Sequence, residues 1–296
     1  MKDHAGVSRT QAFWWVALSY VLALAVAAAI VLLLPSDWHP MKAIALADVA
    51  ATIVVFAASY LTRNSSFYDP YWSVIPIFIS GYLLWLGWEN GADHWRSALA
   101  FALVCAWGVR LTWNWARGWT GLEHEDWRYG QLAEQTGRWY WLVSFSGIHL
   151  FPTVLVFLGC LPLYPAQAID NAPFQGLDLL AVAVTLVGIG FELFADNQKR
   201  RFSLQPANRG KTITSGLWAF SRHPNYFGEI TFWLGLFLFG LAADPTYWWT
   251  MAGYLAMVWL FWFISIPMME KRMVARRPDY REVTKGIPRL FPGFWK

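Results

Sequence analysis

The sequence predicts an all-α fold: a polytopic membrane helix bundle of about eight transmembrane helices, with both termini in the cytoplasm. Of the 296 residues, 57% are hydrophobic and 14% are charged, which leaves too little polar surface to cover a water-soluble body of this size. Apolar runs long enough to cross about 30 Å of hydrocarbon as helices recur along the whole chain. We therefore expect a single membrane domain, residues 1–296, and no large soluble domain.

The expected spans follow from these apolar runs. They cover residues 13–34, 43–62, 72–88, 97–115, 139–161, 177–195, 226–241 and 247–266. The first apolar run lacks a small-residue cleavage site and is followed by further spans, so we expect a retained helix and not a signal peptide.

The basic residues test the even number of spans independently. With both termini in the cytoplasm, 20 of the 23 Lys and Arg fall on the cytoplasmic side. Only Lys42 and Arg96 fall on the other side, and Arg110 lies within the fourth span, as the positive-inside rule requires. The net charge of +4 is explained by this sidedness because the charges flank apolar spans, so we expect no nucleic-acid partner.

Two residue types point to membrane packing and not to redox or metal chemistry. Cys105 and Cys160 lie within expected spans and have no metal-ligand spacing, so the sequence predicts neither a disulfide nor a metal site. Many of the 21 Trp lie near span ends, where an indole ring stays in lipid while its N–H group remains hydrated.

The character of the chain changes after the sixth span. Before it the loops are short, apart from the polar stretch 117–138, which we expect to be the longest central cytoplasmic loop, and an irregular external connection at 162–176. From Asp196 a basic, polar stretch leads to Arg222, and a helical hairpin then turns at Asp244 and Pro245. We divide the domain into N-terminal helices, 1–189, and a C-terminal part, 190–296, where function should be concentrated.

A carboxylate and three cations emerge together where the sixth span ends. Asp196 is followed by Lys199, Arg200 and Arg201. These residues could be a stop-transfer cluster that touches anionic lipid headgroups. Alternatively they form a phosphate and ribose site, in which the cations bind phosphates and Asp196 accepts a hydrogen bond from a hydroxyl.

The segment that opens the seventh span has the features of an anion site. Pro224 suits the first turn of a helix, so Arg222 and His223 should lie just before it, where free N–H groups favour an anion. Asn225, Glu229 and Trp233 are four residues apart and share one helix face. Glu229 should be buried, and an ionisable group inside a span is a functional candidate by default, although a structural pairing with a neighbouring helix would also explain it.

Other polar residues inside the spans have two readings each. Asp48, Arg110 and Glu192 could pair across helices or act in a site, with a pair between Arg110 and either acid as one arrangement. His149 is a lone histidine beside aromatic residues, and we expect a satisfied structural residue.

A polar cluster also opens the third span. Asp69 before Pro70 is a good helix cap, which explains the residue without any catalysis. The functional alternative is that Asp69, Tyr68 or Tyr71 donates a proton or polarises a carbonyl group.

The motif from Arg222 to Glu229, read as Arg-His-Pro-Asn-Tyr-Phe-Gly-Glu, resembles the RHPNYxGD/E motif of sterol reductases and the matching segment of steroid 5-alpha-reductases. Asn197 with Lys199, the lead-in at 215–218, Tyr280 and the segment 287–292 are similar to the same C-terminal module. The first half, through Asn64-Ser65, Asp69-x-x-Trp72 and 125–129, resembles a bacterial membrane family grouped with those reductases.

The resemblance implies that the C-terminal module binds NADPH from the cytoplasmic side and passes hydride to an activated carbon–carbon double bond of a lipid. It implies that Asn225, Glu229 and Trp233 contact the nicotinamide end, and that Asp196, Lys199 and Arg222 hold ribose and phosphates. The full set of implied cofactor-binding residues is Asp196, Lys199, Arg200, Arg222, His223, Asn225, Tyr226, Glu229, Trp233, Glu270 and Tyr280.

The chain also departs from those families. A second tyrosine that sterol reductases carry after the one matching Tyr280 is absent, since Val283 and Thr284 stand there. The arginine and histidine of the last span in steroid 5-alpha-reductases are missing, with Phe263 and Pro267 nearby. The cofactor class therefore transfers better than the substrate or the proton donor.

Two other functions remain open. Isoprenylcysteine carboxyl and phospholipid methyltransferases share an Arg-His-Pro-x-Tyr-x-Gly segment over S-adenosylmethionine, but that version usually lacks the acid at Glu229. A lipid-binding or transport bundle is the third interpretation. It is disfavoured because no span looks broken and no inverted repeat appears in the sequence. We expect a reductase of a steroid or other enone in a bacterial inner membrane, with membrane lipids and a lipid-like substrate as partners and no obligate protein partner.

Overall fold

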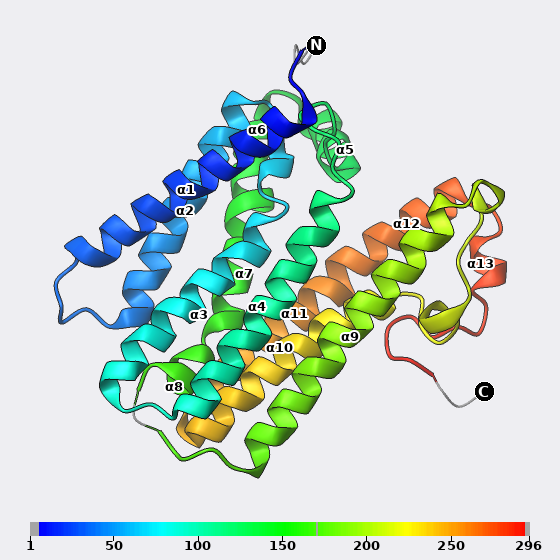
Figure 1. The fold of residues 1–296 in the computed structure, drawn as a ribbon. Helices are drawn as coiled ribbons and strands as arrows, with labels where there is room; N and C mark the ends of the chain where they lie inside the picture. Colours follow the sequence, from blue (N-terminus) through cyan, green and yellow to red (C-terminus); the bar gives the residue numbers. More distant parts are fainter. Residues whose placement is uncertain (1–5, 170, 294–296) are drawn as a thin grey trace. The chain divides into compact units, whose positions relative to one another are not determined.

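The computed structural model describes residues 6–169 and 171–293, and within them it holds helices and no β-strand (Figure 1). The predicted all-α class is confirmed. Among the described residues, seven helical stretches are long and apolar enough to cross a membrane: Arg9–Leu33, Pro40–Leu61, Ser65–Asn90, Trp127–Cys160, Gly176–Leu204, Pro224–Ala243 and Pro245–Arg276. The fold is therefore that of a polytopic membrane helix bundle.

The expected fourth span differs from the other seven. It forms helix α4, His94–Ala116, whose 23 residues extend over about 34 Å at 1.5 Å per residue. Its Arg and Asn residues make it less apolar than the seven stretches, and it is not among them. Placing both termini on one side of the membrane therefore requires α4 to cross as well.

The chain forms two compact units, and the first contains residues 6–82 and 107–157. Its helices α1 (Arg9–Leu33) and α2 (Pro40–Leu61) run side by side (Figure 1). Ser8 caps α1 in a capping box with Gln11, and Pro40 opens α2 after His39, whose ring accepts from the Met41 N–H. A short 3₁₀ helix, η1 (Ser65–Phe67), leads into α3 (Tyr71–Asn90).

The polar stretch 117–138, which was expected to be a loop, contains a helix. Helix α5, Trp127–Thr136, occupies part of it, and Asp126 caps the helix by accepting from the Arg128 N–H. The chain continues through η2 (Gly137–Trp139) and α6 (Tyr140–Val143). A π-helical segment, η3 (Ser144–Leu150), joins α6 to α7 (Phe151–Cys160). The loop prediction was wrong here because α5 is amphipathic and lacks a long apolar run.

The second unit contains residues 83–106 and 158–293 (without 170), and two long helices dominate it. Helices α9 (Gly176–Leu204) and α10 (Pro224–Ala243) lie against each other along much of their length (Figure 1). A Cβ atom on Gly188 would meet the Phe232 nitrogen at 2.5 Å, and one on Gly228 would meet the Gly188 carbonyl oxygen at 2.7 Å. Glycines let the two backbones approach, so Gly228 serves helix packing.

Helix α9 continues nine residues past the predicted end of the sixth span, to Leu204. The basic cluster around Lys199 therefore lies on its last turns and not in a loop. The predicted turn at Asp244 and Pro245 is confirmed, because α10 ends at Ala243 and the 3₁₀ helix η6 spans Pro245–Thr250.

After this turn a long helical run leads to the C-terminal part of the chain. It consists of α11 (Met251–Trp259), the π-helical segment η7 (Leu260–Ser265) and α12 (Ile266–Arg276). Pro267, which lacks an N–H group, lies at the start of α12, where the π-helical hydrogen-bond pattern ends. A short helix, α13 (Tyr280–Val283), follows. The segment 162–176, expected to be irregular, contains the short helix α8, Leu163–Gln167.

Candidate functional site

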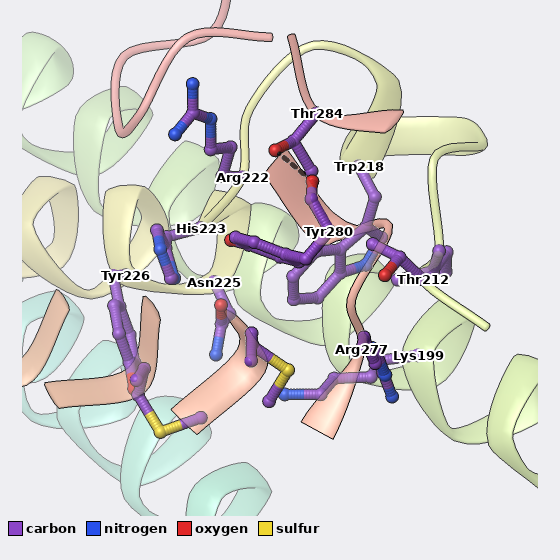
Figure 2. Close-up of a pocket in the computed structure, with 13 residues that line it drawn as sticks. Lys199, Thr212, Trp218, Arg222, His223, Asn225, Tyr226, Arg277, Tyr280 and Thr284 are labelled. Carbon is purple, nitrogen blue, oxygen red and sulfur yellow. Dashed lines mark hydrogen bonds between the residues drawn. The ribbon is translucent and has the colours of Figure 1, made fainter. Parts of the chain in front are cut away.

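A pocket in the second unit lies between the end of α9, the start of α10 and the arm formed by α12 and α13 (Figure 2). Its cavity volume is about 50 Å³, within about 550 Å³ of atom-free space that includes the open mouth. Six of the eleven residues predicted to bind a cofactor line it. The lining residues are Lys199, Thr212, Ile213, Trp218, Arg222, His223, Asn225, Tyr226, Met269, Met273, Arg277, Tyr280 and Thr284.

The start of α10 supplies one wall. Pro224 is the first helical residue, as predicted, and Asn225 and Tyr226 of the same turn line the pocket. The first N–H groups of a helix have no partners within the helix, so this end carries a partial positive charge. The ring of Tyr226 stacks on that of His223, with the centroids 5.3 Å apart.

The segment 287–293, here called the C-terminal strap, fixes Arg222 and its neighbours. The Arg222 N–H donates to the Pro288 carbonyl and its Nε donates to the Ile287 carbonyl, both at 2.9 Å. The Ser221 hydroxyl donates to the Leu290 carbonyl at 2.7 Å. The motif residues at 287–292, which the resemblance singled out, are therefore the partners of the Arg-His-Pro segment.

Lys199 reaches the pocket from the last turns of α9. Its Nζ lies over the ring of Trp218, 5.3 Å from the centroid. Trp218 is itself fixed because its indole N–H donates to the Ala195 carbonyl at 3.0 Å. The side-chain oxygen of Gln198 accepts from the Leu217 N–H at 2.9 Å, which attaches the 215–218 lead-in to α9.

The charge of the pocket wall is positive. Lys199, Arg222 and Arg277 all line it, and none of the described lining residues is Asp or Glu. Glu270 lies behind this wall, with its carboxylate 3.4 Å from Arg222 and 3.2 Å from Arg289. One carboxylate thus balances part of the charge, and the remaining cations favour an anionic ligand.

Two polar atoms in the pocket wall lack a hydrogen-bond partner among the described residues: Thr212 Oγ1 and His223 Nε2. The carboxylate of Glu270 is 3.6 Å from His223 Nε2, which is beyond hydrogen-bond length. Leaving such a group unpaired costs about 1–3 kcal/mol. A ligand with oxygen acceptors would remove this cost, so the donor set fits a phosphate group such as those of NADPH.

Burial affects the two ionisable rings in the pocket wall. It lowers the pKa of His223 below its ordinary value, and the Glu270 carboxylate opposes part of that effect. It also raises the pKa of Tyr280, so that the phenol is a neutral donor at physiological pH. Figure 2 shows Tyr280 extending across the pocket with its hydroxyl directed toward His223.

The size of the cavity limits which part of a cofactor it encloses. Sites for drug-sized ligands and cofactors typically measure about 300–1,000 Å³. At about 50 Å³ the cavity holds a phosphate-sized group, and the rest of a dinucleotide would extend into the open mouth.

Five predicted cofactor-binding residues do not line the pocket: Asp196, Arg200, Glu229, Trp233 and Glu270. Arg200 is exposed on α9. Glu229 is 4% exposed, which confirms its predicted burial, and its Oε1 accepts from the Trp233 indole N–H at 2.9 Å. The predicted alignment of these two residues on one helix face is confirmed, and their contact with a nicotinamide stays a prediction.

The first unit contains the three candidate proton donors. Tyr71 is 1% exposed, and its hydroxyl donates to Asp48 Oδ1 at 3.0 Å. The Tyr68 hydroxyl lies 2.8 Å from Thr153 Oγ1, and both groups are buried. Asp48 is 2% exposed, and its Oδ2 has no hydrogen-bond partner among the described residues.

The third candidate, Asp69, belongs to a different group of contacts. Its Oδ1 accepts from the Tyr129 hydroxyl at 2.5 Å. Nearby, the side chain of Glu125 accepts from the Ser65 N–H at 2.7 Å, and the Asp126 N–H donates to Ser66 Oγ at 3.0 Å. The motifs of the first half, at 64–72 and 125–129, are thus hydrogen-bonded to each other.

His149 is satisfied, as expected. Its Nδ1 lies 2.9 Å from the Ser144 carbonyl oxygen, and its Nε2 lies 3.0 Å from Ser59 Oγ. A carbonyl oxygen can only accept, so Nδ1 carries the proton and Nε2 accepts from the Ser59 hydroxyl.

Sequence reasoning missed several residues of these sites. Thr212 and Arg277 line the pocket from a loop and from the end of α12, and no motif marked them. Asp48 was noted only as an intramembrane acid, and Thr153 was not noted. Helical spacing would not have found them, because the pocket and the contacts of Asp48 with Tyr71 and of Thr153 with Tyr68 bring together elements distant in sequence.

The helices and the pocket define a class: a polytopic helical membrane protein with a cation-lined pocket at the start of a membrane-spanning helix. The chain belongs to the family described as protein of unknown function DUF1295, whose family model matches residues 55–287. It is 28% identical over 262 residues to an uncharacterized protein of Schizosaccharomyces pombe, an alignment that covers 81% of this chain and 76% of the yeast protein. No solved structure matches it significantly.

Proposed function

We propose that the protein is a membrane-embedded, NADPH-dependent reductase, related to steroid 5-alpha-reductases and sterol reductases, that reduces an activated C=C bond of a lipid such as a steroid or another enone. The observation that carries the proposal is the pocket of the second unit. It combines three cationic side chains, two unpaired polar atoms and aromatic rings beside the Arg-His-Pro-Asn segment.

Charge favours NADPH over S-adenosylmethionine as the ligand. NADPH carries several negative charges on its phosphates, whereas S-adenosylmethionine carries a sulfonium and an ammonium group against one carboxylate. Lys199, Arg222 and Arg277 would attract the first and repel the cationic groups of the second. Trp218 and Tyr280 offer ring surfaces for a base.

In this proposal Lys199, Arg222 and Arg277 hold phosphates, and Asn225, Glu229 and Trp233 serve the nicotinamide end. Asp196 and Arg200, near the end of α9, interact with the outer part of the nucleotide. Bound there, NADPH supplies a hydride to the electron-poor carbon of the substrate. Positioning of the two reactants accounts for much of the expected rate enhancement.

The reduction also needs one proton, and the first unit holds the acid that suits this role best. Of Asp69, Tyr68 and Tyr71, only Tyr71 is bonded to a carboxyl group that is itself buried, that of Asp48. In the proposed step, the Tyr71 hydroxyl turns from Asp48 to the developing enolate oxygen and transfers its proton, which gives an enol that tautomerises to the ketone. Asp48 in its acid form donates a proton to the Tyr71 oxygen, and the resulting carboxylate takes up a proton again from the medium. Such polarisation is strongest where water is excluded.

We place the enzyme in a bacterial inner membrane, with the pocket open to the cytoplasm. The clustering of Lys and Arg at one set of helix ends supports this orientation. The substrate would enter from the lipid, as expected for an apolar enone.

Ligand binding to the purified protein tests the proposal directly. NADPH should raise the melting temperature and quench tryptophan fluorescence, and the Trp218→Phe variant should show a smaller quench because Trp218 lines the pocket. S-Adenosylmethionine at the same concentration should change neither signal. The reverse pattern would favour a methyltransferase of the isoprenylcysteine carboxyl methyltransferase type and would overturn the reductase proposal.

A further inference from the structure

The hydrogen bonds of the first unit distinguish the roles of Tyr68 and Tyr71. The hydroxyl of Thr153 is central to this network because its Oγ1 has three close oxygen neighbours. The His149 carbonyl oxygen is 2.9 Å away, and the hydroxyl oxygens of Thr52 and Tyr68 are each 2.8 Å away.

A threonine hydroxyl has one proton, and its direction follows from these neighbours. The carbonyl oxygen of His149 has no proton, so at 2.9 Å it must accept the proton of Thr153. Thr153 then has only lone pairs for its other two neighbours. Tyr68 and Thr52 are therefore both donors to Thr153, and Thr153 has no proton that it could return to Tyr68. Tyr71 differs because its partner, the Asp48 carboxyl group, can release a proton to it.

The position of Thr153 is in turn fixed by the turn of helix before it. The bond from Thr153 to the His149 carbonyl spans four residues at the start of α7. His149 lies in the last turn of the π-helical segment η3. Both of its ring nitrogens are hydrogen-bonded, Nδ1 to the Ser144 carbonyl and Nε2 to the Ser59 hydroxyl. π-Helical turns are frequent at functional sites.

These contacts also determine where the tyrosine rings lie. The ring of Tyr68 packs against that of His149, with the centroids 5.0 Å apart, and against that of Tyr71 at 5.5 Å. Tyr68 thus lies between the fixed His149 ring and the ring of Tyr71. Its hydroxyl is bonded away from Asp48, the partner of Tyr71.

We propose that Tyr68 is a positioning residue and not the proton donor, and that Thr153 holds it in place so that its ring fixes the ring of Tyr71. This inference rests on the proposed reductase function, in which Tyr71 donates the proton. It adds Thr153, a residue outside every sequence motif, to the residues on which turnover depends.

Turnover by four single variants tests these roles, with NADPH oxidation followed in the presence of progesterone, an enone steroid, or cyclohex-2-enone. Tyr71→Phe should lose turnover by about 100-fold or more, which is the usual contribution of an acid. Tyr68→Phe and Thr153→Val remove the same bond between the two hydroxyls but no transferred proton, so each should lower kcat by a similar and modest factor, about three- to tenfold, without changing the KM for NADPH. Thr153→Ser, which keeps the hydroxyl, should restore kcat.

One result would overturn the inference: a Tyr68→Phe protein that melts like wild type and binds NADPH normally, but loses as much turnover as Tyr71→Phe. Failure of Thr153→Ser to recover turnover in an equally stable protein would also contradict the role of the Thr153 hydroxyl.

A second measurement decides the point if no probe enone is reduced, an outcome that would count against the proposed function alone. The Raman Fermi doublet of tyrosine reports whether a phenol donates or accepts a hydrogen bond. The difference spectrum between wild type and Tyr68→Phe should show a donor, and the same difference in a Thr153→Val background should not. An acceptor-type spectrum for Tyr68 would refute the hydrogen-bond assignment.

Discussion

Arg96 and Asp178 form a buried bidentate ion pair in which Nε and Nη2 of the arginine donate to the two carboxylate oxygens at 2.7 and 2.8 Å. Both side chains are fully buried, and Arg96 also donates to the Ala172 carbonyl at 2.6 Å. The pair joins the start of α4 to the start of α9 in the second unit. The sequence predicted that Arg96 flanks a span, and the structure shows that it forms an ion pair between two helices.

Removing one partner of this pair should destabilise the protein strongly. Arg96→Met leaves the Asp178 carboxylate buried and uncompensated, so we expect a loss of about 3–5 kcal/mol. Denaturant unfolding in detergent micelles would measure it. The double variant Arg96→Met/Asp178→Leu removes both charges and should be more stable than the single variant. A single variant within 1 kcal/mol of wild type would contradict a buried, uncompensated charge.

The close contact between α9 and α10 gives a second prediction. Gly188→Ala places a Cβ 2.5 Å from the backbone nitrogen of Phe232, so the helices must separate, and we expect a cost of about 1–3 kcal/mol. Gly190→Ala, two residues along the same helix, has no atom within 4 Å of the new Cβ and should be neutral or stabilising. Melting temperatures of the two variants measured side by side test the contact. Equal values would show that the helices do not meet at Gly188.

Charge in the pocket should govern NADPH affinity. Each charge-assisted hydrogen bond contributes about 1.5–3 kcal/mol, so Arg222→Ala and Lys199→Ala should each weaken NADPH binding by about 10-fold or more. Arg209→Ala removes the same charge from an exposed position outside the pocket and is the matched control. Isothermal titration in low-salt buffer would measure the dissociation constants. Equal effects of all three variants would indicate general attraction by the protein surface and no specific site.

Glu229 can be tested without unfolding the protein. In Glu229→Gln the amide oxygen still accepts from the Trp233 N–H, so the melting temperature should stay near that of wild type. If the carboxylate contacts the nicotinamide end as proposed, NADPH binding should weaken several-fold. Unchanged affinity would restrict Glu229 to its bond with Trp233 within α10.

The pH dependence of stability should depend on His223. Burial lowers its pKa in the folded state below the ordinary value of about 6.5, so the unfolded chain takes up the proton first as pH falls. The contribution of His223 to stability is therefore fully present above about pH 6.5 and is lost as pH falls through the lowered folded pKa. Melting curves between pH 8 and 5 should show a decline that is smaller in His223→Gln. An equal decline in both proteins would assign it to other groups.

Sequence reasoning recovered the helices better than their ends. Long apolar runs located seven spans, because burial in lipid leaves a strong compositional signal. Apolar runs did not predict α5 or the last turns of α9, where the helix continues through polar residues such as Lys199. Those turns matter most for the candidate site, since they bring Lys199 to Trp218.

The features of the candidate site that could be predicted are those that involve residues close together in the sequence. Pro224 at the start of a helix and the bond from Trp233 to Glu229 follow from helical spacing. The pairing of Tyr71 with Asp48, and of Arg222 with the C-terminal strap, joins residues that are 23 and 65 positions apart. Such contacts depend on packing, which no single-sequence pattern encodes.

The C-terminal strap also bears on when the pocket forms during synthesis. The main-chain N–H and the Nε of Arg222 donate to the carbonyls of residues 288 and 287, and the Gly293 N–H donates to the Phe220 carbonyl. Most of the spans will already be in the bilayer when these residues leave the ribosome. The cation-lined pocket is therefore among the last parts of the protein to mature, and a nascent chain halted before Ile287 would be inserted in the membrane without the contacts that hold Arg222 in the pocket wall.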